Sequence, residues 1–346
     1  LIHEYLNGWF PKLGLWSGRV VYLDTHAGRG EHAQGQIGSP VVALETLLRH
    51  QFRDRILEHS EVKFMFIEHD ADNVDVLKRK ASALGDLPDR VCVTVSAEDC
   101  YTQIEAMLQR LEYCGKRIAP AFAFVDPYGF NVPGALLSRL LRAGRVELFV
   151  NVIWRELDMA ISGELVNPGS RMSETLDLIF DGDRWRQIDP SRNFDERADQ
   201  TIDLLKDVYG AEWVTSVRML GKNNATRYIL AHFTNHDGGR DLMKECVWKI
   251  CPEGGFYARR SDNPNQTRLI VPEPDLAPLG RWLRSKLKNG PRRWSELTDA
   301  LRSELWLNKH LSLVVREFRK DKRIVATAYK GRFSKKADPL LSLTEE

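Results

Sequence analysis

Hydrophobic and polar positions in the first 154 residues alternate between two patterns. Short apolar runs, many rich in β-branched residues, recur at 19–24, 62–68, 91–96, 121–126 and 146–154, and amphipathic stretches separate them. Runs of the first kind are typical of buried strands, whereas the stretches between them predict helices. The alternation predicts βαβ units around a doubly wound, mostly parallel sheet, which is an α/β fold.

The helices between these strands are expected at 39–52, 71–84, 101–114 and 133–143. At the first of them, Ser39 is expected to cap the N-terminus, and Pro40 to lie in the first turn, where its missing N–H costs nothing. After the fifth strand, the polar and Arg-rich segment 155–195 is expected to form a helical insertion that covers the cleft at the end of the sheet, with Trp185 in the core.

A hairpin pattern follows the insertion. After a helical stretch at 197–209 come two strands, 213–220 and 227–234, with only residues 221–226 between them. So short a connection cannot hold a crossover helix, so the two strands must form an antiparallel hairpin within an otherwise parallel sheet. By fold analogy, an antiparallel strand at this place distinguishes a class I methyltransferase-like (Rossmann-like) sheet from a dinucleotide-binding one.

Charge is unevenly distributed along the chain. The net charge is +2, yet residues 276–346 contain 17 Lys and Arg against 8 Asp and Glu. The proline-containing segment 272–281 reads as a linker before this basic region. We therefore expect two domains, a methyltransferase-like domain at 1–275 and a small basic domain at 276–346.

The basic domain shows helical patterns at 292–305 and 308–323, followed by a strand pair or wing at 324–333. The apolar positions of the second helix fall on one face: Leu311, Val314, Val315 and Phe318. This order predicts a winged helix that binds nucleic acid through its second helix and its wing. Docking to a protein is the alternative. The expected nucleic-acid contacts are Arg316, Arg319, Lys320, Arg323, Lys330 and Arg332.

Acidic residues stand where successive strands of the predicted sheet end. Ligands of open α/β sheets bind at this edge. In the first loop, "DTHAGRG", Gly28 and Gly30 let the backbone approach a ligand closely. Glu68 can accept both hydroxyls of a ribose, and Glu98 or Asp99 lies where an adenine edge is expected. The candidate cofactor-binding residues are Asp24, His26, Gly28, Gly30, Glu68 and Asp99.

The spacing after the first strand indicates which nucleoside-bearing ligand is expected. A dinucleotide site places its glycine turn at a helix N-terminus, which faces the pyrophosphate. Here the residues "EHAQGQIG" separate Gly30 from Ser39, and acids surround the site. These features favour a cationic cofactor, S-adenosylmethionine, with Asp24 placed to orient its sulfonium-bearing end.

The fourth strand runs into Asp126, Pro127, Tyr128 and Gly129 in "AFAFVDPYGF". Methylation of an exocyclic amine requires acceptors that hold the amine and a surface that clamps the base. Asp126 and the carbonyl of Pro127 can accept from the amine, and Tyr128 can stack on the ring. Catalysis would then be mainly the positioning of a near-attack geometry. An ordinary turn is the alternative reading of these residues.

At these residues the chain resembles the three-Cys-motif partner proteins, through "YLDTHAGRG", "GSPVVALETL", "FMFIEHD", "AFVDPYGF" and "YILAHFTNHDGGRDLMKECVWK". The resemblance implies a class I methyltransferase-like fold and a companion protein that resembles radical S-adenosylmethionine enzymes and carries the three cysteines. "DTHAGRG" is also similar to the first motif of an rRNA adenine methyltransferase, and "DPYG" to the Asp-Pro-Phe-Gly of tRNA guanine dimethyltransferases. These similarities imply an exocyclic amine of a base, in RNA rather than DNA.

Other features of the sequence argue against a membrane protein, a secreted protein and a metal site. No apolar run approaches the roughly 18 to 20 residues of a bilayer span, and the N-terminus has no signal-peptide layout. The five cysteines form no CxxC pair, so no metal site is expected. We expect a soluble, cytoplasmic protein without a membrane partner. Two other functions remain open: a non-catalytic protein that binds nucleic acid or the companion, and a nuclease in which Asp24, Glu68 and Asp126 collect a metal.

Overall fold

The computed structural model describes residues 1–32, 35–166, 169, 171–221, 224–252, 257–259, 273–329 and 331–344. Contacts within the chain divide them into two compact units. Unit 1 comprises residues 1–246 and 257–259, and unit 2 comprises residues 247–252 and 273–344. None of the described helices is both long and apolar enough to span a bilayer.

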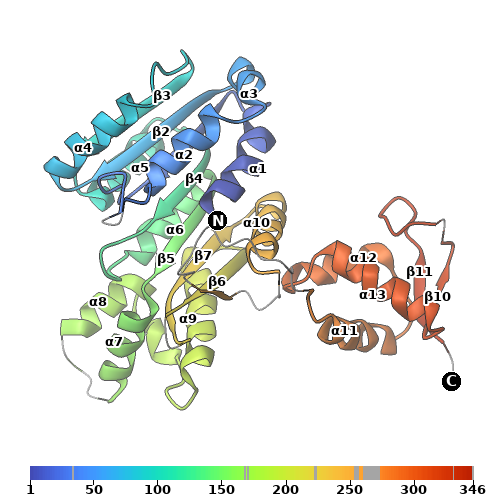
Figure 1. Ribbon diagram of the computed structural model, residues 1–346. Coiled ribbons are helices and arrows are strands. Elements are labelled where there is room, and N and C mark those ends of the chain that lie inside the picture. The colour runs from blue at the N-terminus through green and yellow to red at the C-terminus, as the bar shows by residue number, and fades with distance from the viewer. Residues whose placement is uncertain are drawn as a thin grey trace. The chain divides into compact units, whose positions relative to one another are not determined.

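Unit 1 is built on a sheet whose strands follow the order β3-β2-β1-β4-β5-β7-β6-β8 (Figure 1). The strands are β1 (Arg19–Asp24), β2 (Glu61–Glu68), β3 (Val91–Ala97), β4 (Ile118–Val125), β5 (Gly144–Val152), β6 (Trp213–Leu220), β7 (Thr226–Thr234) and β8 (Tyr257–Arg259). Neighbouring strands from β3 to β5 are parallel, whereas β7 runs antiparallel to both β5 and β6. The predicted α/β fold with a class I methyltransferase-like sheet is confirmed.

The β6–β7 hairpin explains why the sheet contains an antiparallel strand. Ser216 pairs with Ala231 in the hairpin, and Ala231 in turn pairs with Val150 of β5. In the connection, Asn224 has a φ of 60°, a left-handed conformation that Asn adopts more readily than most residues. The short turn thus returns the chain antiparallel, as the sequence predicts.

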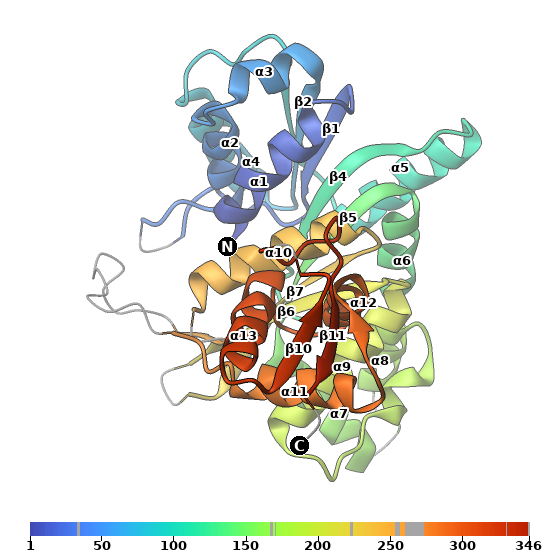
Figure 2. The ribbon, with the colours of Figure 1, turned by 90° about the vertical axis from the view of Figure 1, so that its right-hand side faces the viewer.

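Helices cover both faces of the sheet. They include α1 (Ile2–Gly14), α2 (Ser39–Leu48), α3 (Arg53–His59), α4 (Ala71–Ser82), α5 (Cys100–Tyr113), α6 (Gly134–Arg142), α9 (Phe194–Tyr209) and α10 (Asp237–Ile250). Helices α1, α2 and α4 lie on one side of the strands, and α5 and α6 lie on the other (Figure 2). Helix α9 packs against α6 on that second side.

Side chains of β1 alternate between these two layers. Val21 and Leu23 belong to the core shared with α5, α6 and α9. Tyr22 points to the other face, where its ring stacks on Phe122 and Phe122 lies 5.1 Å from the ring of Tyr5 of α1. Burial of both faces explains the nearly continuous apolar run of the strand.

Helix α1 was not predicted, and a buried carboxylate of β5 anchors it. Glu147 accepts hydrogen bonds from the Tyr5 hydroxyl, from Trp9 Nε1 at 3.0 Å and from His232 Nε2 of β7 at 2.8 Å. Burial opposes the charge, but these donors and His232 outweigh it and lower the pKa of Glu147. Glu147 is therefore held in its ionised form although it is fully buried.

The start of α2 differs from the prediction. The predicted helix at 39–52 is shorter than expected: α2 ends at Leu48, and a separate helix, α3, begins at Arg53. The N-cap of α2 is Gly38 rather than Ser39. The Gly38 N–H donates to the Gly30 carbonyl at 2.8 Å, and a Cβ on Gly38 would lie 2.9 Å from that backbone. This close approach makes Gly38 the last non-helical residue, with Ser39 the first residue of the helix. Pro40 lies in the first turn, as predicted.

The segment after β5 is helical, as predicted. It contains α7 (Trp154–Val166), α8 (Arg171–Phe180) and the 3-10 helix η1 (Asp183–Gln187). Trp185 is fully buried in the core and its Nε1 donates to Asp177 at 2.8 Å. Arg197 of α9 donates to both carboxylate oxygens of Asp158 at 2.7 and 2.8 Å, which ties the insertion to the sheet-covering helices.

Unit 2 consists of helices and a small antiparallel sheet of order β10-β11-β9. Its elements are α11 (Ala277–Lys288), β9 (Arg292–Arg293), α12 (Trp294–Ala300), the 3-10 helix η2 (Leu301–Ser303), α13 (Asn308–Lys320), β10 (Ile324–Thr327) and β11 (Leu340–Leu343). The apolar face predicted for α13 is buried.

Two local predictions for unit 2 are wrong. Helix α11 begins at Ala277, inside the predicted linker 272–281, whose first residue lies outside the described residues. The strand that pairs with β10 is β11, not a strand within 324–333. The apolar residues Leu279, Leu283 and Leu341 of α11 and β11 are needed to complete the core of the unit. The winged-helix assignment stays a prediction.

Candidate active site

Asp24 is the last residue of β1 and is fully buried. The Tyr22 hydroxyl donates to its Oδ2 at 3.3 Å, whereas Oδ1 has no hydrogen-bond partner among the described residues. Burial raises the pKa of Asp24 from 3.8 to about 7, and Asp126 also raises it. The nearby Ser39 hydroxyl and His26 N–H lower this pKa, although neither makes a hydrogen bond to Asp24 in the structure. Near neutral pH, Asp24 is therefore poised between its two forms and has one oxygen without a donor.

The loop after β1 is held against the neighbouring strands by its backbone. The Ala27 N–H donates to the carbonyl of Ile67 in β2 at 2.9 Å, and the Gly28 N–H donates to Glu68 Oε2 at 2.8 Å. Gly28 and Gly30 have φ values of 60° and 76°, which glycine adopts without strain. The predicted glycine positions therefore shape this loop.

Glu68 ends β2 and binds two backbone groups. Its Oε2 accepts from Gly28 and its Oε1 accepts from the Asp70 N–H at 2.9 Å. A carboxylate oxygen can accept a second hydrogen bond. The Glu68 side chain therefore fixes the first loop and still has acceptor capacity for the two hydroxyls of a ribose.

His26 lies in the middle of the site and is half-buried. Its Nδ1 lies 2.8 Å from the Thr25 hydroxyl, its Nε2 lies 3.4 Å from Cys100 Sγ, and its ring makes an edge contact with Tyr101. Burial lowers the pKa of His26, and burial raises the pKa of Cys100 to about 12. Both groups are therefore uncharged near neutral pH.

The predicted acids converge on His26. Asp126, Glu68 and Asp99 each act to raise its pKa against the effect of burial, and Asp126 acts on Asp24 as well. The carboxyl ends of parallel strands lie at the same edge of a sheet, and these acids stand at or just after the ends of their strands. Asp24 and Glu68 end β1 and β2, and Asp99 and Asp126 follow β3 and β4, so all four acids lie at one edge of the sheet, which we call the acidic edge.

Asp99 also caps the helix that follows β3. Its Oδ1 accepts from the Thr102 N–H and hydroxyl, both at 2.8 Å. The N–H bond is the main reason why the pKa of Asp99 is lowered. Asp99 is exposed, so a ligand can still reach the second oxygen.

The Asp126-Pro127-Tyr128 turn directly follows β4. Asp126 is half-buried and Pro127 is buried, whereas Tyr128 is fully exposed to solvent. Asn151 of β5 donates from Nδ2 to Asp126 Oδ1 at 2.6 Å. The stacking role of Tyr128 stays a prediction.

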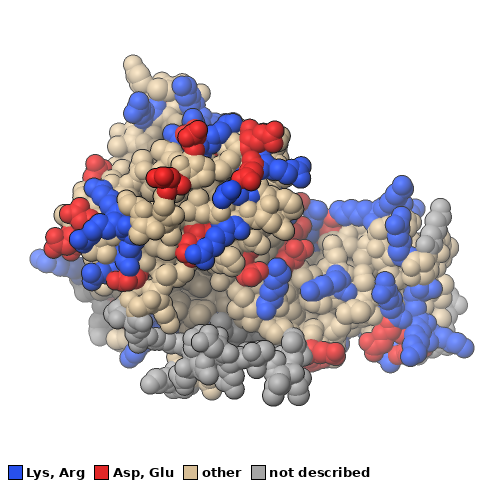
Figure 3. All heavy atoms as spheres, turned by 45° about the horizontal axis from the view of Figure 1, so that its top comes forward, with Lys and Arg blue, Asp and Glu red and all other residues tan. Residues whose placement is uncertain are grey.

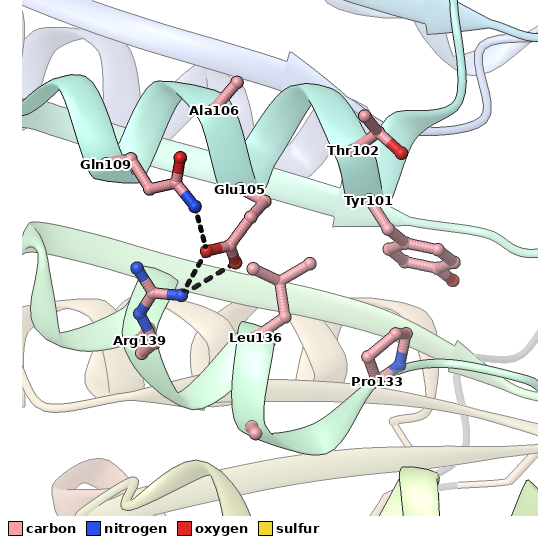
Figure 4. A pocket seen from close by; sticks show the side chains of 9 residues that line it. Tyr101, Thr102, Glu105, Ala106, Gln109, Pro133, Leu136 and Arg139 are labelled. Atoms are coloured by element: carbon pink, nitrogen blue, oxygen red, sulfur yellow. Dashed lines mark hydrogen bonds and ion pairs between the residues drawn. The ribbon is translucent and has the colours of Figure 1, made fainter.

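A groove between α5 and α6 opens beside the site (Figure 4). It has a volume of about 610 Å³, with Tyr101 and Pro133 at one end. Toward the other end, Arg139 binds both oxygens of Glu105 at 2.7 Å, and Gln109 donates to Glu105 at 2.9 Å. Because Tyr101 also contacts His26, this end of the groove adjoins the acidic edge.

The predicted nucleic-acid contacts lie in unit 2. Figure 3 shows Lys and Arg spread more widely than Asp and Glu over the visible face of this unit. Arg316 and Lys320 of α13 are exposed, whereas the Arg319 guanidinium lies 3.9 Å from the centre of the Tyr329 ring. Arg323 pairs with Asp321 at 2.9 Å.

The remaining two predicted contacts belong to the segment after β10. Arg332 is exposed and, with Lys336, lines a hollow of about 510 Å³. Lys330 lies outside the described residues. The structure therefore provides exposed cations on both α13 and this segment.

Four residues of the site were not predicted: Ser39, Cys100, Tyr101 and Asn151. Ser39 looks like a helix cap in the sequence, which hides its position beside Asp24. Of these four residues, Asn151 could have been noticed in the sequence, because it is an amide within an otherwise largely apolar strand pattern. Its partner lies 25 positions away, so only the sheet order brings the two together.

No family model and no curated protein matches the chain. Solved structures with some similarity include Trm1 from Pyrococcus horikoshii with S-adenosyl-L-methionine, at 14% identity and a TM-score of 0.38, covering 99% of this chain and 91% of that one. A Legionella pneumophila protein is 12% identical with a TM-score of 0.38, covering 72% and 90%. The methyltransferase domain of a bacterial Hen1 is 11% identical with a TM-score of 0.32, covering 67% and 97%.

Proposed function

We propose that the chain uses S-adenosylmethionine to methylate an exocyclic amine of a nucleic-acid base, in RNA rather than DNA. The observation that carries this proposal is the buried Asp24 Oδ1, which has no donor among the described residues. A buried acceptor left without a partner costs about 1–3 kcal/mol. A ligand that brings an ammonium or sulfonium charge to the end of β1 would remove this cost.

The other acids fit the remaining parts of such a cofactor. Glu68 would accept the ribose hydroxyls, Asp99 would meet the adenine, and the backbone at Gly28 and Gly30 would allow close approach. His26 would line the site as a neutral ring. The cofactor supplies an electrophilic methyl group on a sulfonium sulfur.

The substrate amine would be held by acceptors of the turn after β4. Asp126 and the Pro127 carbonyl each accept one N–H, which frees the nitrogen lone pair from the ring and aims it at the methyl carbon. The bound cofactor would give up its methyl group to this nitrogen, so that a nitrogen–carbon bond would replace the sulfur–carbon bond and the cofactor would leave as a thioether. The nitrogen then loses one proton to Asp126 or to water, and Tyr128 would stack on the base.

The cations of unit 2 would supply affinity for the nucleic-acid backbone. Arg316 and Lys320 of α13 are exposed, and Arg332 lies on the segment after β10. With three to five phosphate contacts on a duplex, the logarithm of affinity should fall with the logarithm of salt concentration at a slope of about −3 to −4.5. A flat response would assign unit 2 to protein docking.

We also propose that the chain is a three-Cys-motif partner protein that acts with its companion. This proposal is supported by the sequence motifs around Asp24, Glu68 and Asp126, which resemble those of this family and supply residues of the acidic edge. The test is to co-express the chain with a three-Cys-motif companion protein and to measure whether the two co-purify. Methyl transfer that is unchanged by the companion, with no co-purification, would contradict this part.

The function is tested by titration calorimetry with S-adenosylmethionine, followed by transfer of a tritiated methyl group to total RNA and to DNA. We expect saturable binding and label in RNA, with Asp126→Ala binding cofactor but transferring none. Mass spectrometry of the nucleosides would identify the methylated amine. Label in DNA alone would reverse the preference for RNA.

Other outcomes correspond to the alternatives. Cofactor binding without transfer to any nucleic acid would make the chain a non-catalytic binding protein. Magnesium-dependent cleavage would indicate the nuclease; among the described residues, no three His, Cys, Asp or Glu side chains are grouped to hold a metal ion.

A further inference from the structure

Asn151 places an amide beside the acid of the turn. It is the second-last residue of β5, and the neighbouring pair Val125 and Val150 joins β4 to β5 directly before it. Its backbone is paired with Leu230 of β7. A side chain on so regular a strand is better fixed than one in a loop, so Asn151 is suited to hold Asp126.

The contact between the two side chains is specific. Asn151 Nδ2 donates to Asp126 Oδ1 at 2.6 Å. Within the described residues, no hydrogen bond is made to Asp126 Oδ2. The amide thus occupies one carboxylate oxygen, sets the plane of the carboxylate and leaves the other oxygen to a ligand.

Asn151 does not favour the stability of the folded protein. Its Oδ1 is buried and has no partner among the described residues, which costs folding free energy. An apolar residue of similar size would avoid this cost within β5. Because Asp126 is half-buried, water can replace the lost hydrogen bond on the acid. The structural benefit of an amide here is therefore small.

We propose that Asn151 is a positioning residue that presents Asp126 Oδ2 to the amine of the substrate base. This inference rests on the proposed function and narrows it. With Oδ1 taken by Asn151, the site offers two acceptors, Asp126 Oδ2 and the Pro127 carbonyl. Two acceptors match the two N–H groups of a primary amine, as in adenine, cytosine and guanine. A carbonyl oxygen at this place, as in uracil or hypoxanthine, would face two acceptors and be rejected.

The variant Asn151→Leu separates positioning from stability. It keeps the size of the side chain, removes the orphaned oxygen and releases Asp126. Urea unfolding of the free protein should show a stability equal to or above that of the wild type. Calorimetry should show unchanged affinity for S-adenosylmethionine. The rate of single-turnover methyl transfer to RNA should fall by about 10- to 100-fold, because small misplacement of reacting groups has effects of this size.

A double-mutant cycle shows whether Asn151 acts through Asp126. Adding Asn151→Leu to Asp126→Asn should change the transfer rate by less than about twofold, because the carboxylate that Asn151 positions is already gone. The conservative variant Asn151→Ser, which keeps a donor, should recover part of the rate.

Several results would overturn the inference. They are wild-type transfer rates in Asn151→Leu, a rate loss that persists undiminished in the Asp126→Asn background, and a fall in stability that matches the fall in rate. If the wild-type protein transfers no methyl group to any nucleic acid, the proposed function fails and the inference falls with it. If the wild type is active and the Asn151 variants transfer the methyl group at the wild-type rate, the inference alone is wrong.

Discussion

Replacing Asp24 by asparagine is expected to stabilise the unliganded protein at alkaline pH. Asp24 is fully buried, and burial raises its pKa from 3.8 to about 7. Between these two values the folded state holds a proton that the unfolded state has lost. Stability contributed by this proton is therefore present at low pH and is lost as the pH rises toward 7.

The magnitude follows from the two pKa values. Each pKa unit corresponds to about 1.4 kcal/mol, so ionising Asp24 in the folded protein costs on the order of 4 kcal/mol above pH 7. Asparagine has nearly the same size, carries no charge and can still accept from Tyr22. The free energy of unfolding of Asp24→Asn should therefore exceed that of the wild type by this order at pH 8 and approach it at pH 4.

Urea unfolding followed by tryptophan fluorescence at pH 4, 6 and 8 measures this difference. Asp99→Asn is the matched control, because Asp99 is exposed and its pKa is lowered by Thr102, so its replacement should not stabilise at pH 8. Asp24→Asn should also lose affinity for S-adenosylmethionine. An Asp24→Asn protein that is no more stable than the wild type at pH 8 would show that the Asp24 carboxylate does not destabilise the folded state.

Four further predictions concern separate parts of the chain. Glu68→Gln should weaken cofactor binding by about 10-fold in calorimetry, because the acceptor of the Gly28 N–H loses its charge; unchanged affinity would remove Glu68 from the site. Replacing Arg316 and Lys320 together by alanine should reduce the salt slope of RNA binding by about 2, measured by fluorescence anisotropy; an unaltered slope would place the RNA elsewhere. A Cβ at Gly134 would lie 2.2 Å from a carbonyl oxygen of α8, so Gly134→Ala should lose about 1–3 kcal/mol of stability. Gly163→Ala in α7, where the space is open, should gain up to about 1 kcal/mol in the same unfolding assay.

The acidic edge could be predicted because its geometry follows from strand pairing. Asp24, Glu68 and Asp126 each stand at or just after the end of an apolar run, and parallel strands bring such ends to one side of a sheet. The hairpin was equally readable, since 221–226 is too short for a crossover. In both cases local patterns determine the outcome.

Other features depend on long-range contacts that no local pattern contains. Ser39 lies near enough to Asp24 to affect its pKa only because the Gly38 N–H bonds back to the Gly30 carbonyl. The amide of Asn151 meets Asp126 only because β5 lies beside β4. The strand that pairs with β10 was predicted within 324–333, whereas it is β11 at Leu340–Leu343. A sequence pattern does not give the length of the segment between two paired strands.

The most direct test of the central claim is a crystal structure of the protein grown with S-adenosylmethionine. We expect the cofactor at the carboxyl edge of the sheet, with its amino-acid end at Asp24, its ribose at Glu68 and its methyl group facing Asp126. Cofactor bound away from these carboxylates, or a site that stays empty at saturating concentration, would contradict it.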